Sequence, residues 1–202
     1  MVLTSYLPLK KPRRRGLAEP TWFVMRDLKR RNACLPAWKM LSDAGFEVFT
    51  PMEEVLTVVQ GKHRRILRPY IQDLLFVKST RVALDPVVNK TPTLQYRFAK
   101  GMGYMEPMFV PDKQMEDFMT AVMSGYSHTF ISPQELSPAM IGKMVRIIGG
   151  PMNGFTGHIL SLRGARKRKV LVEIPNLIAA AVEVEPEYIE IINKTCPQPT
   201  ER

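Results

Sequence analysis

The chain has 202 residues, of which 45% are hydrophobic and 24% are charged, and these proportions exclude wholesale disorder. No apolar run approaches the roughly 18–20 residues of a membrane-spanning helix, and two cysteines cannot build a disulfide framework or a four-cysteine metal site. The formal net charge of +10 predicts a polyanionic partner. The protein is expected to be cytoplasmic and monomeric and not to bind membranes.

The first 20 residues form a segment of their own. They hold five basic side chains and three prolines without apolar periodicity, which is typical of a flexible basic tail. From residue 21 to 124, short apolar runs alternate with helical periodicity, and this favours a mixed α/β domain. The expected strands of that domain are residues 22–25, 46–49, 74–77 and 94–98.

Two helices are expected in this domain. One starts near Leu35 and ends at a glycine cap, Gly45. The other is capped by Asp112 and carries an apolar stripe at helical spacing, formed by Met115, Phe118, Met119, Val122 and Met123. Residues 85–93 contain two prolines and are expected to form a loop with one helical turn.

A hairpin is expected between the first helix and the strand at 74–77. Two extended stretches, 53–59 and 64–68, flank Gln60-Gly61-Lys62. Glycine tolerates the positive φ that a tight turn needs, so this spacing predicts a charged β-hairpin.

The sequence changes character after residue 124. Residues 125–138 contain two Ser-Pro pairs and are predicted to be a linker. Residues 139–194 then hold five short strands with turn signals between them, which predicts a small β-barrel, followed by a tail at 195–202. The expected strands are 144–148, 156–162, 169–174, 177–184 and 188–192.

The most specific motif lies at the start of this second domain. The run from Gly142 to Ile159 resembles the KOW motif, in which a strand, a Gly-Pro turn, a Gly-aromatic-x-Gly turn and a second strand open an SH3-like barrel. Glycine suits tight turns because it reaches positive φ at little cost. The motif residues are Gly142, Gly150, Pro151, Gly154, Phe155 and Gly157.

The preceding domain resembles the N-terminal domain of NusG, called NGN. The resemblance rests on the run from Trp22 to Arg26, the run from Gly45 to Pro51, the charged hairpin, and Arg68-Pro69 leading to the strand at 75–77. It implies an α+β fold: an NGN-type α/β sandwich with a mostly antiparallel sheet, joined by a linker to the KOW barrel. Residues 109–119 and 131–134 are similar to the UpxY branch of NusG paralogs.

The resemblance also implies a function. NusG-type proteins bind the clamp helices and reach the gate loop of RNA polymerase, and UpxY-type paralogs act as antiterminators on capsular polysaccharide operons. Where family members read Phe-Pro-Gly-Tyr, this chain has residues 71–74, Ile-Gln-Asp-Leu, which adds a charge at Asp73. The residues to which polymerase contact is assigned are Trp22, Tyr70, Ile71 and Leu74.

Two basic clusters are candidates for contact with non-template DNA or leader RNA, the alternative being solvated surface. The first cluster is Lys29, Arg30 and Arg31, and the second is Arg163, Arg166, Lys167, Arg168 and Lys169. In the KOW domain, Pro175-Asn176-Leu177-Ile178 replaces the glycine and aromatic found where family members meet a ribosomal protein, which argues against ribosome contact.

Two other classes of function are alternatives to an elongation factor. A KOW-containing RNA-binding or ribosome-associated protein would lack the NGN pattern of residues 22–77. An enzyme is disfavoured because His63, His128 and His158 have no ligand or carboxylate at metal or triad spacing. No metal, cofactor or catalytic residue is therefore expected.

Overall fold

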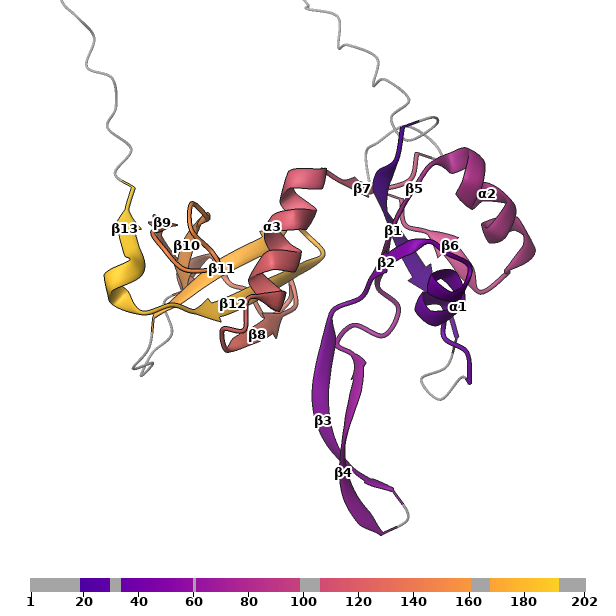
Figure 1. The fold of residues 1–202 in the computed structure, drawn as a ribbon, viewed down its shortest axis with the longest axis horizontal. Coiled ribbons are helices and arrows are strands. Elements are labelled where there is room, and N and C mark those ends of the chain that lie inside the picture. The colour runs from indigo at the N-terminus through magenta and orange to yellow at the C-terminus, as the bar shows by residue number, and fades with distance from the viewer. Residues whose placement is uncertain (1–18, 30–33, 60, 99–105, 161–167, 193–202) are drawn as a thin grey trace, which may run out of the picture. The chain divides into compact units, whose positions relative to one another are not determined.

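The computed structural model describes residues 19–29, 34–59, 61–98, 106–160 and 168–192. The chain divides into two compact units, Met1–Val110 and Pro111–Arg202, whose elements are labelled in Figure 1. Both units combine antiparallel strands with helices, which confirms the mixed α/β fold class. Within the described part of the chain, no helix is long and apolar enough to cross a membrane.

The first unit is built on an antiparallel sheet with the strand order β2-β5-β1-β6, and β7 also pairs with β1. A separate two-stranded sheet is formed by β3 and β4. The strands are β1 (Thr21–Asp27), β2 (Glu47–Phe49), β3 (Met52–Val59), β4 (Lys62–Pro69), β5 (Leu75–Ser79), β6 (Leu94–Tyr96) and β7 (Phe109–Val110). The helices are α1 (Ala37–Asp43) and α2 (Arg81–Lys90).

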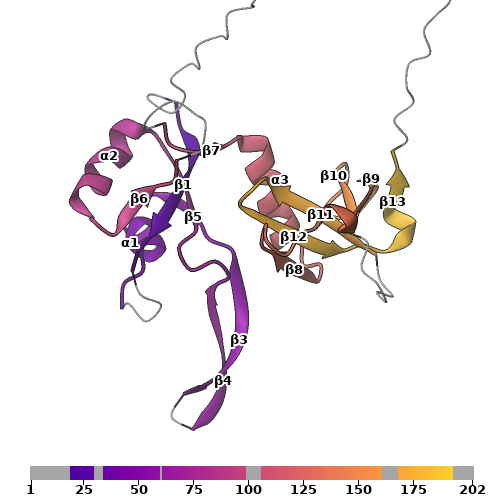
Figure 2. The ribbon, with the colours of Figure 1, turned by 180° about the vertical axis from the view of Figure 1, so that it is seen from behind.

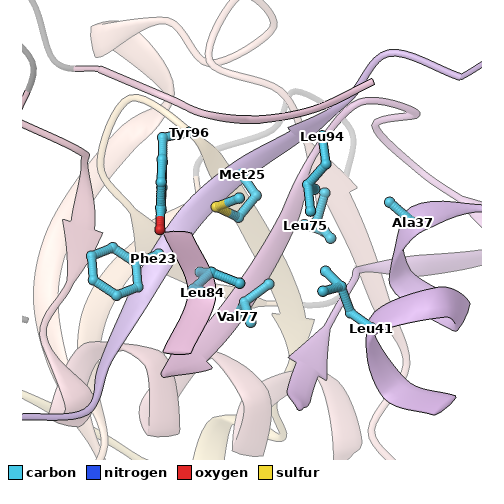
Figure 3. Packing of buried hydrophobic residues seen from close by; sticks show 9 residues of the cluster. All are labelled: Phe23, Met25, Ala37, Leu41, Leu75, Val77, Leu84, Leu94 and Tyr96. Atoms are coloured by element: carbon cyan, nitrogen blue, oxygen red, sulfur yellow. The ribbon is translucent and has the colours of Figure 1, made fainter. Parts of the chain in front are cut away.

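Both helices pack on one face of the larger sheet. Alternate residues of a strand point to the same face, so Phe23 and Met25 of β1 lie beside Leu75 and Val77 of β5. Leu41 of α1 belongs to the same buried cluster, which Figure 3 shows from close by. The remaining members are Ala37, Leu84, Leu94 and Tyr96. This core fixes β1 and β5, and therefore the loops at their ends.

The end of α1 confirms the predicted glycine cap. Gly45 has a φ of +85°, its N–H donates to the carbonyl of Ser42, and the next N–H, of Phe46, donates to the carbonyl of Leu41. This pair of bonds is the Schellman arrangement that satisfies the last carbonyls of a helix.

Residues 81–90 form the helix α2, so the prediction of a mainly loop segment at 85–93 was wrong. Thr80 caps the helix, because its hydroxyl accepts a hydrogen bond from the N–H of Ala83 at 3.3 Å. Pro86 lies inside the helix and supplies no N–H. Leu84 anchors the helix in the core at 0% exposure, and this burial outweighs the missing hydrogen bond.

Among its described residues, the second unit has one α-helix packed on a sheet of six strands. The helix is α3 (Asp112–Met123), and the strands are β8 (His128–Ile131), β9 (Ile141–Ile147), β10 (Thr156–Leu160), β11 (Lys169–Ile174), β12 (Ile178–Glu183) and β13 (Ile189–Ile191). Single turns of 3-10 helix at Pro138–Met140 and Pro186–Tyr188 precede β9 and β13. The strands from β9 to β13 confirm the five predicted in this region.

The sheet of the second unit is not closed into the predicted barrel. Its described strands run in the open order β13-β9-β10-β11-β12-β8. The reason lies in residues 128–131, which were predicted to be linker. They form β8 and pair with β12 from Ala179 to Val182, so they take the free edge of that strand.

The helix α3 belongs to the second unit, whereas the sequence places it in the first domain. It packs against β11 and β12, and its buried residues are Met115, Phe118 and Ala121. The buried face of the helix therefore differs from the expected stripe: it includes Ala121, and Met123, which was expected on it, is 67% exposed. The N-cap is Pro111, and Asp112 is the first helical residue rather than the cap.

Candidate functional site

A tight turn at residues 70–74 joins the hairpin to β5 and lies at the end of β1. The N–H of Tyr70 donates to the carbonyl of Pro51 at 2.9 Å, and the N–H of Leu74 donates to the carbonyl of Ile71 at 3.1 Å. The side-chain amide of Gln72 donates to the carbonyl of Lys29 at 3.0 Å. These three hydrogen bonds fix the conformation of the turn and tie it to Pro51 and Lys29. Tyr70 and Ile71 are half-buried.

Asp73, the charge that the sequence adds in this turn, is paired. Its carboxylate accepts from Arg26 of β1 at 3.1 Å and from Arg97 at 3.2 Å. The backbone carbonyl of Asp73 also accepts from the N–H of Asp27 at 3.3 Å. Asp73 therefore ties the turn to β1 and to Arg97, and its charge is offset by two arginines.

An apolar groove of about 340 Å³ lies between the base of the hairpin, the start of α1 and the turn. Its apolar walls include Trp38 of α1 and two hairpin residues, Ile66 and Leu67, which are 42% and 69% exposed. The hydroxyl of Thr50 lines the groove as well, and it is buried without a hydrogen-bond partner among the described residues. The groove is thus an apolar surface with one unsatisfied polar atom.

Two of the four residues assigned to polymerase contact are buried. Trp22 is 2% exposed, packs below the Lys78 ammonium at 5.7 Å, and offers no surface to a partner. Leu74 is 1% exposed and is one of the residues that line the groove. These two side chains are thus buried in the structure, whereas Tyr70 and Ile71 retain accessible surface, and polymerase contact by the four residues stays a prediction.

The first basic cluster is described only at Lys29. Its ammonium donates to the carbonyl of Leu35 at 2.7 Å, which holds the segment before α1 against the end of β1. Lys29 also lines the groove. This residue is an anchor of the groove wall, and the assigned Arg30 and Arg31 lie outside the described residues.

The second basic cluster is described only at its last two members. Arg168 is exposed, while Lys169 opens β11 and pairs with Glu183 of β12 at 3.7 Å. The ammonium of Lys169 also donates to the hydroxyl of Thr129 at 3.3 Å. Lys169 therefore takes part in the sheet, and Arg163, Arg166 and Lys167 lie outside the described residues.

The KOW-type residues surround the turn between β9 and β10. Gly150 and Gly154 adopt φ values of +66° and +84°, as the turn prediction requires, with Pro151 exposed between them. Gly142 stands near the start of β9, where its carbonyl lies 3.0 Å from Nδ1 of His158. Phe155 is half-buried, with the Lys113 ammonium 5.8 Å from its ring.

Gly157 has a different role from the one predicted. It lies in β10 without a positive φ, and a Cβ at this position would stand 2.5 Å from the carbonyl oxygen of Leu171 in β11. The glycine therefore permits a close approach of two strands. The sequence motif places a glycine here, but the reason for it lies in a strand that begins 12 residues later.

The sequence analysis did not predict the groove. Its walls come from residues that are far apart in the chain, including Trp38, Thr50 and Leu67, and their individual patterns read as helix, strand end and hairpin. The available signal was a hairpin strand with two adjacent apolar residues, Ile66 and Leu67, because alternation allows only one of them to face inward. Among the described residues, no cluster of three or more metal-ligating side chains accompanies the groove.

The chain was compared with known protein families, curated proteins and solved structures. Residues 20–119 match the family described as transcription termination factor nusG. A comparison with curated proteins finds no match. The chain is similar to a solved structure described as "Domain interaction in Thermotoga maritima NusG", with 18% sequence identity and a TM-score of 0.42, over 88% of this chain and 100% of that chain. Residues 20–119, which run from the start of the first unit into α3, are therefore similar to the NusG family.

Proposed function

We propose that this chain is a transcription elongation factor of the antiterminator kind, which binds RNA polymerase through the groove and the turn at residues 70–74. The match of residues 20–119 to the NusG family supports this proposal, since proteins of that family bind RNA polymerase in general. The observation that carries it is the groove, because apolar surface lined by Trp38, Ile66 and Leu67 suits an apolar ridge of a partner.

The partner surface that we assign to the groove is the pair of clamp helices, with the gate loop as a second contact. A helix can lay an apolar face into such a groove, and residues at helical spacing then act as anchors. Ile71 and Tyr70 would widen the contact beside the groove. The protein performs no chemistry in this scheme. It binds the closed-clamp state of polymerase more tightly than the open state and so shifts the population toward processive transcription.

The specific target that we propose is the operon for capsular polysaccharide synthesis, as in the UpxY branch, with the second unit acting as a KOW-type module. Support comes from the UpxY-like segments at 109–119 and 131–134, which include β7, the first part of α3 and the last residue of β8. This part of the proposal predicts a longer readthrough past terminators in that operon and nearly unchanged readthrough on unrelated templates. An equal effect on all templates would point to a general elongation factor.

The docking test replaces one exposed groove residue and a matched residue elsewhere. Leu67→Glu introduces a charge into the groove wall at a side chain that is 69% exposed, and Val82→Glu does the same on α2 at 70% exposure. Because both side chains lie at the surface, both variants should fold. Burying an unpaired carboxylate in the interface costs several kcal/mol, so Leu67→Glu should weaken binding to core polymerase by at least ten-fold.

Binding can be measured by pull-down and by titration of labelled chain with core polymerase. Val82→Glu should bind as the unmodified chain does. If Leu67→Glu also binds with unchanged affinity, the groove is not the docking surface. If the unmodified chain fails to bind core polymerase at all, the alternative function of a KOW-containing RNA-binding or ribosome-associated protein takes its place.

A further inference from the structure

The strand β13 forms one end of the described sheet of the second unit, as Figure 1 shows and Figure 2 shows from behind. It pairs with β9, from Ile189 opposite Ile147 to Ile191 opposite Val145. Among the described residues, no strand pairs with its outer side. The edge of a sheet presents unpaired backbone N–H and C=O groups, to which a further strand can be added.

Alternate residues of β13 direct their backbone groups to this outer side. In an antiparallel pair, the backbone hydrogen bonds join every second residue. On the inner side, the carbonyl of Tyr188 and the N–H of Ile192 bond to the β9 segment. Glu190 lies midway between them and bonds inward as well. The N–H and C=O groups of Ile189 and Ile191 therefore face the outer edge.

The side chains of β13 are apolar on one face of the sheet and acidic on the other. Ile189 and Ile191 stand opposite buried residues of β9, and Ile191 is still 45% exposed. Glu190 points to the other face, where its carboxylate lies 3.9 Å from the guanidinium of Arg146. This distance is longer than a hydrogen bond, and both side chains are half exposed. The carboxylate of Glu190 therefore has room for a second cation.

The inner neighbour shows which residues suit β13. The strand β9 presents Val145-Arg146-Ile147 to it, which is an apolar, a basic and an apolar residue. A strand on the outer side would meet the same three side chains of β13, so the same pattern suits it. Two further exposed acids, Glu185 and Glu187, precede β13 and favour a basic partner at this edge.

We infer that β13 binds an extended segment of another protein, which reads apolar-basic-apolar and pairs antiparallel with its outer edge. This is the mode of recognition in which main-chain hydrogen bonds give affinity and alternate side chains give specificity. The site lies within the second unit and uses neither the groove nor the turn at residues 70–74. It is therefore a second interaction surface beside the proposed polymerase contact.

A second copy of this chain is a poorer occupant of the same edge. Full antiparallel overlap of β13 with its copy places Ile189 opposite Ile191 and Glu190 opposite the Glu190 of the copy. Like charges directly opposite each other destabilise a sheet. A basic residue in that position instead completes an opposite-charge pair with Glu190, and this selects a partner of different sequence.

The test uses the full chain and a synthetic peptide, Lys-Met-Val-Arg-Ile-Ile, which copies residues 143–148. Backbone amide shifts of the isotope-labelled chain are followed by NMR during the titration. The shifts of Ile189 and Ile191 should exceed that of Glu190, because only the two isoleucine N–H groups gain a new acceptor. We expect a Kd on the order of 1 mM, since ordering a short peptide offsets most of the gain from a few backbone bonds.

Two N-methylated peptides distinguish strand pairing from non-specific contact. In the inferred register, the N–H groups of the peptide residues that copy Val145 and Ile147 face β13. Methylation of both nitrogens should abolish binding. Methylation of the arginine nitrogen, which faces away from β13, should leave the affinity within about two-fold.

A charge exchange tests the role of Glu190. Glu190→Arg should weaken binding of the peptide by about five-fold, and a peptide with glutamate in place of arginine should bind this variant better than the unmodified chain. Glu116→Arg, at an exposed position of α3, is the control and should bind the original peptide with unchanged affinity.

Three outcomes would overturn the inference. The first is the absence of shifts at Ile189 and Ile191 at several times the expected Kd. The second is an equal loss of affinity for the two N-methylated peptides, because that would exclude pairing along the outer edge. The third is an equal effect of Glu190→Arg and Glu116→Arg. None of these outcomes depends on polymerase docking, since the assay contains no polymerase and leaves the groove in place.

Discussion

The carboxylate of Asp27, at the end of β1, accepts a hydrogen bond from the backbone N–H of Ala37 at 2.7 Å, ten residues further along the chain. Its other oxygen accepts from the backbone N–H of Lys29 at 2.9 Å. Pro36 occupies the N-cap of α1 and has no side-chain acceptor, so Asp27 satisfies an orphan donor of that helix from a neighbouring strand. The contact also sets one wall of the groove.

Replacing Asp27 by alanine should destabilise the first unit by about 2–3 kcal/mol, because two N–H groups in a largely buried site lose their acceptor. Urea unfolding followed by tryptophan fluorescence reports on this region, since Trp38 lies in α1. Asp43→Ala, in the last turn of the same helix, is the control. It should change stability by less than about 0.5 kcal/mol, because its carboxylate is exposed and lies at the negative end of the helix.

Gly157→Ala should destabilise the second unit by about 1–3 kcal/mol, the usual cost of overpacking. The added Cβ would stand 2.5 Å from the carbonyl oxygen of Leu171 and 2.9 Å from Cγ1 of Val170, so β10 and β11 would have to separate. Amide hydrogen exchange in the two strands is the measurement, with the exposed Thr156→Ala as control. Unchanged protection in Gly157→Ala would show that the strands can move apart without loss.

Tyr96 predicts a stability that falls at alkaline pH. Burial, and then the hydrogen bond that its hydroxyl donates to Asp85 at 2.8 Å, raise the pKa of Tyr96 above its ordinary value of 10.0. The folded chain keeps this proton when the unfolded chain has released it. The contribution of Tyr96 is therefore complete below about pH 10 and is lost as pH rises from there toward the folded pKa.

The Tyr96→Phe variant isolates this contribution. Near neutral pH it should be about 1 kcal/mol less stable than the unmodified chain, because the hydrogen bond to Asp85 is lost. The difference in unfolding free energy between the two chains should shrink above pH 10. There, Tyr96 ionises in the unfolded state of the unmodified chain and lowers its stability, whereas the variant has no tyrosine at this position. Urea unfolding at pH 8 and pH 10.5 measures both values. Tyr188→Phe, at a ring that is 41% exposed, is the control and should give only a small difference at pH 8.

The ion pairs of Asp73 should be worth little individually. A double-mutant cycle with Asp73→Ala and Arg97→Ala should give a coupling free energy of about 0.5–1 kcal/mol, since both side chains are partly exposed. The matched cycle with Glu54→Ala and Arg65→Ala should give almost none, because that pair is 3.5 Å apart and far more exposed. A coupling above about 2 kcal/mol at Asp73 would show that the turn depends on it much more strongly.

Local patterns in the sequence predicted the elements whose causes are local. The strand alternation of 169–174 matches β11, Gly61 marks the hairpin, and Gly45 ends α1, because turn geometry and side-chain period act over a few residues. The helix α2 was missed because Pro86 is read locally as a breaker, while the burial of Leu84 depends on the sheet beneath it.

The candidate site depends on contacts between distant residues, and the sequence predicted it only in part. In the sequence Asp73 is only an added charge, and the pattern does not reveal that Arg26 of β1 and Arg97, just after β6, pair with it. Trp22 belongs to the run that resembles NusG, but this run does not show whether the Trp22 side chain is buried or exposed. The pairing of residues 128–131 with β12 could not be predicted, because Ser-Pro pairs around that short run indicate a linker.

The independent pairing of β3 with β4 has a consequence for how such a protein can diversify. Matched insertions or deletions at the tip change the length of the hairpin by equal steps on both strands and leave the register at Met52 and Pro69 intact. Length and tip composition can therefore change without cost to the core that holds α1 and α2. A chain built in this way can acquire new target preferences while the rest of its first unit stays under selection for folding.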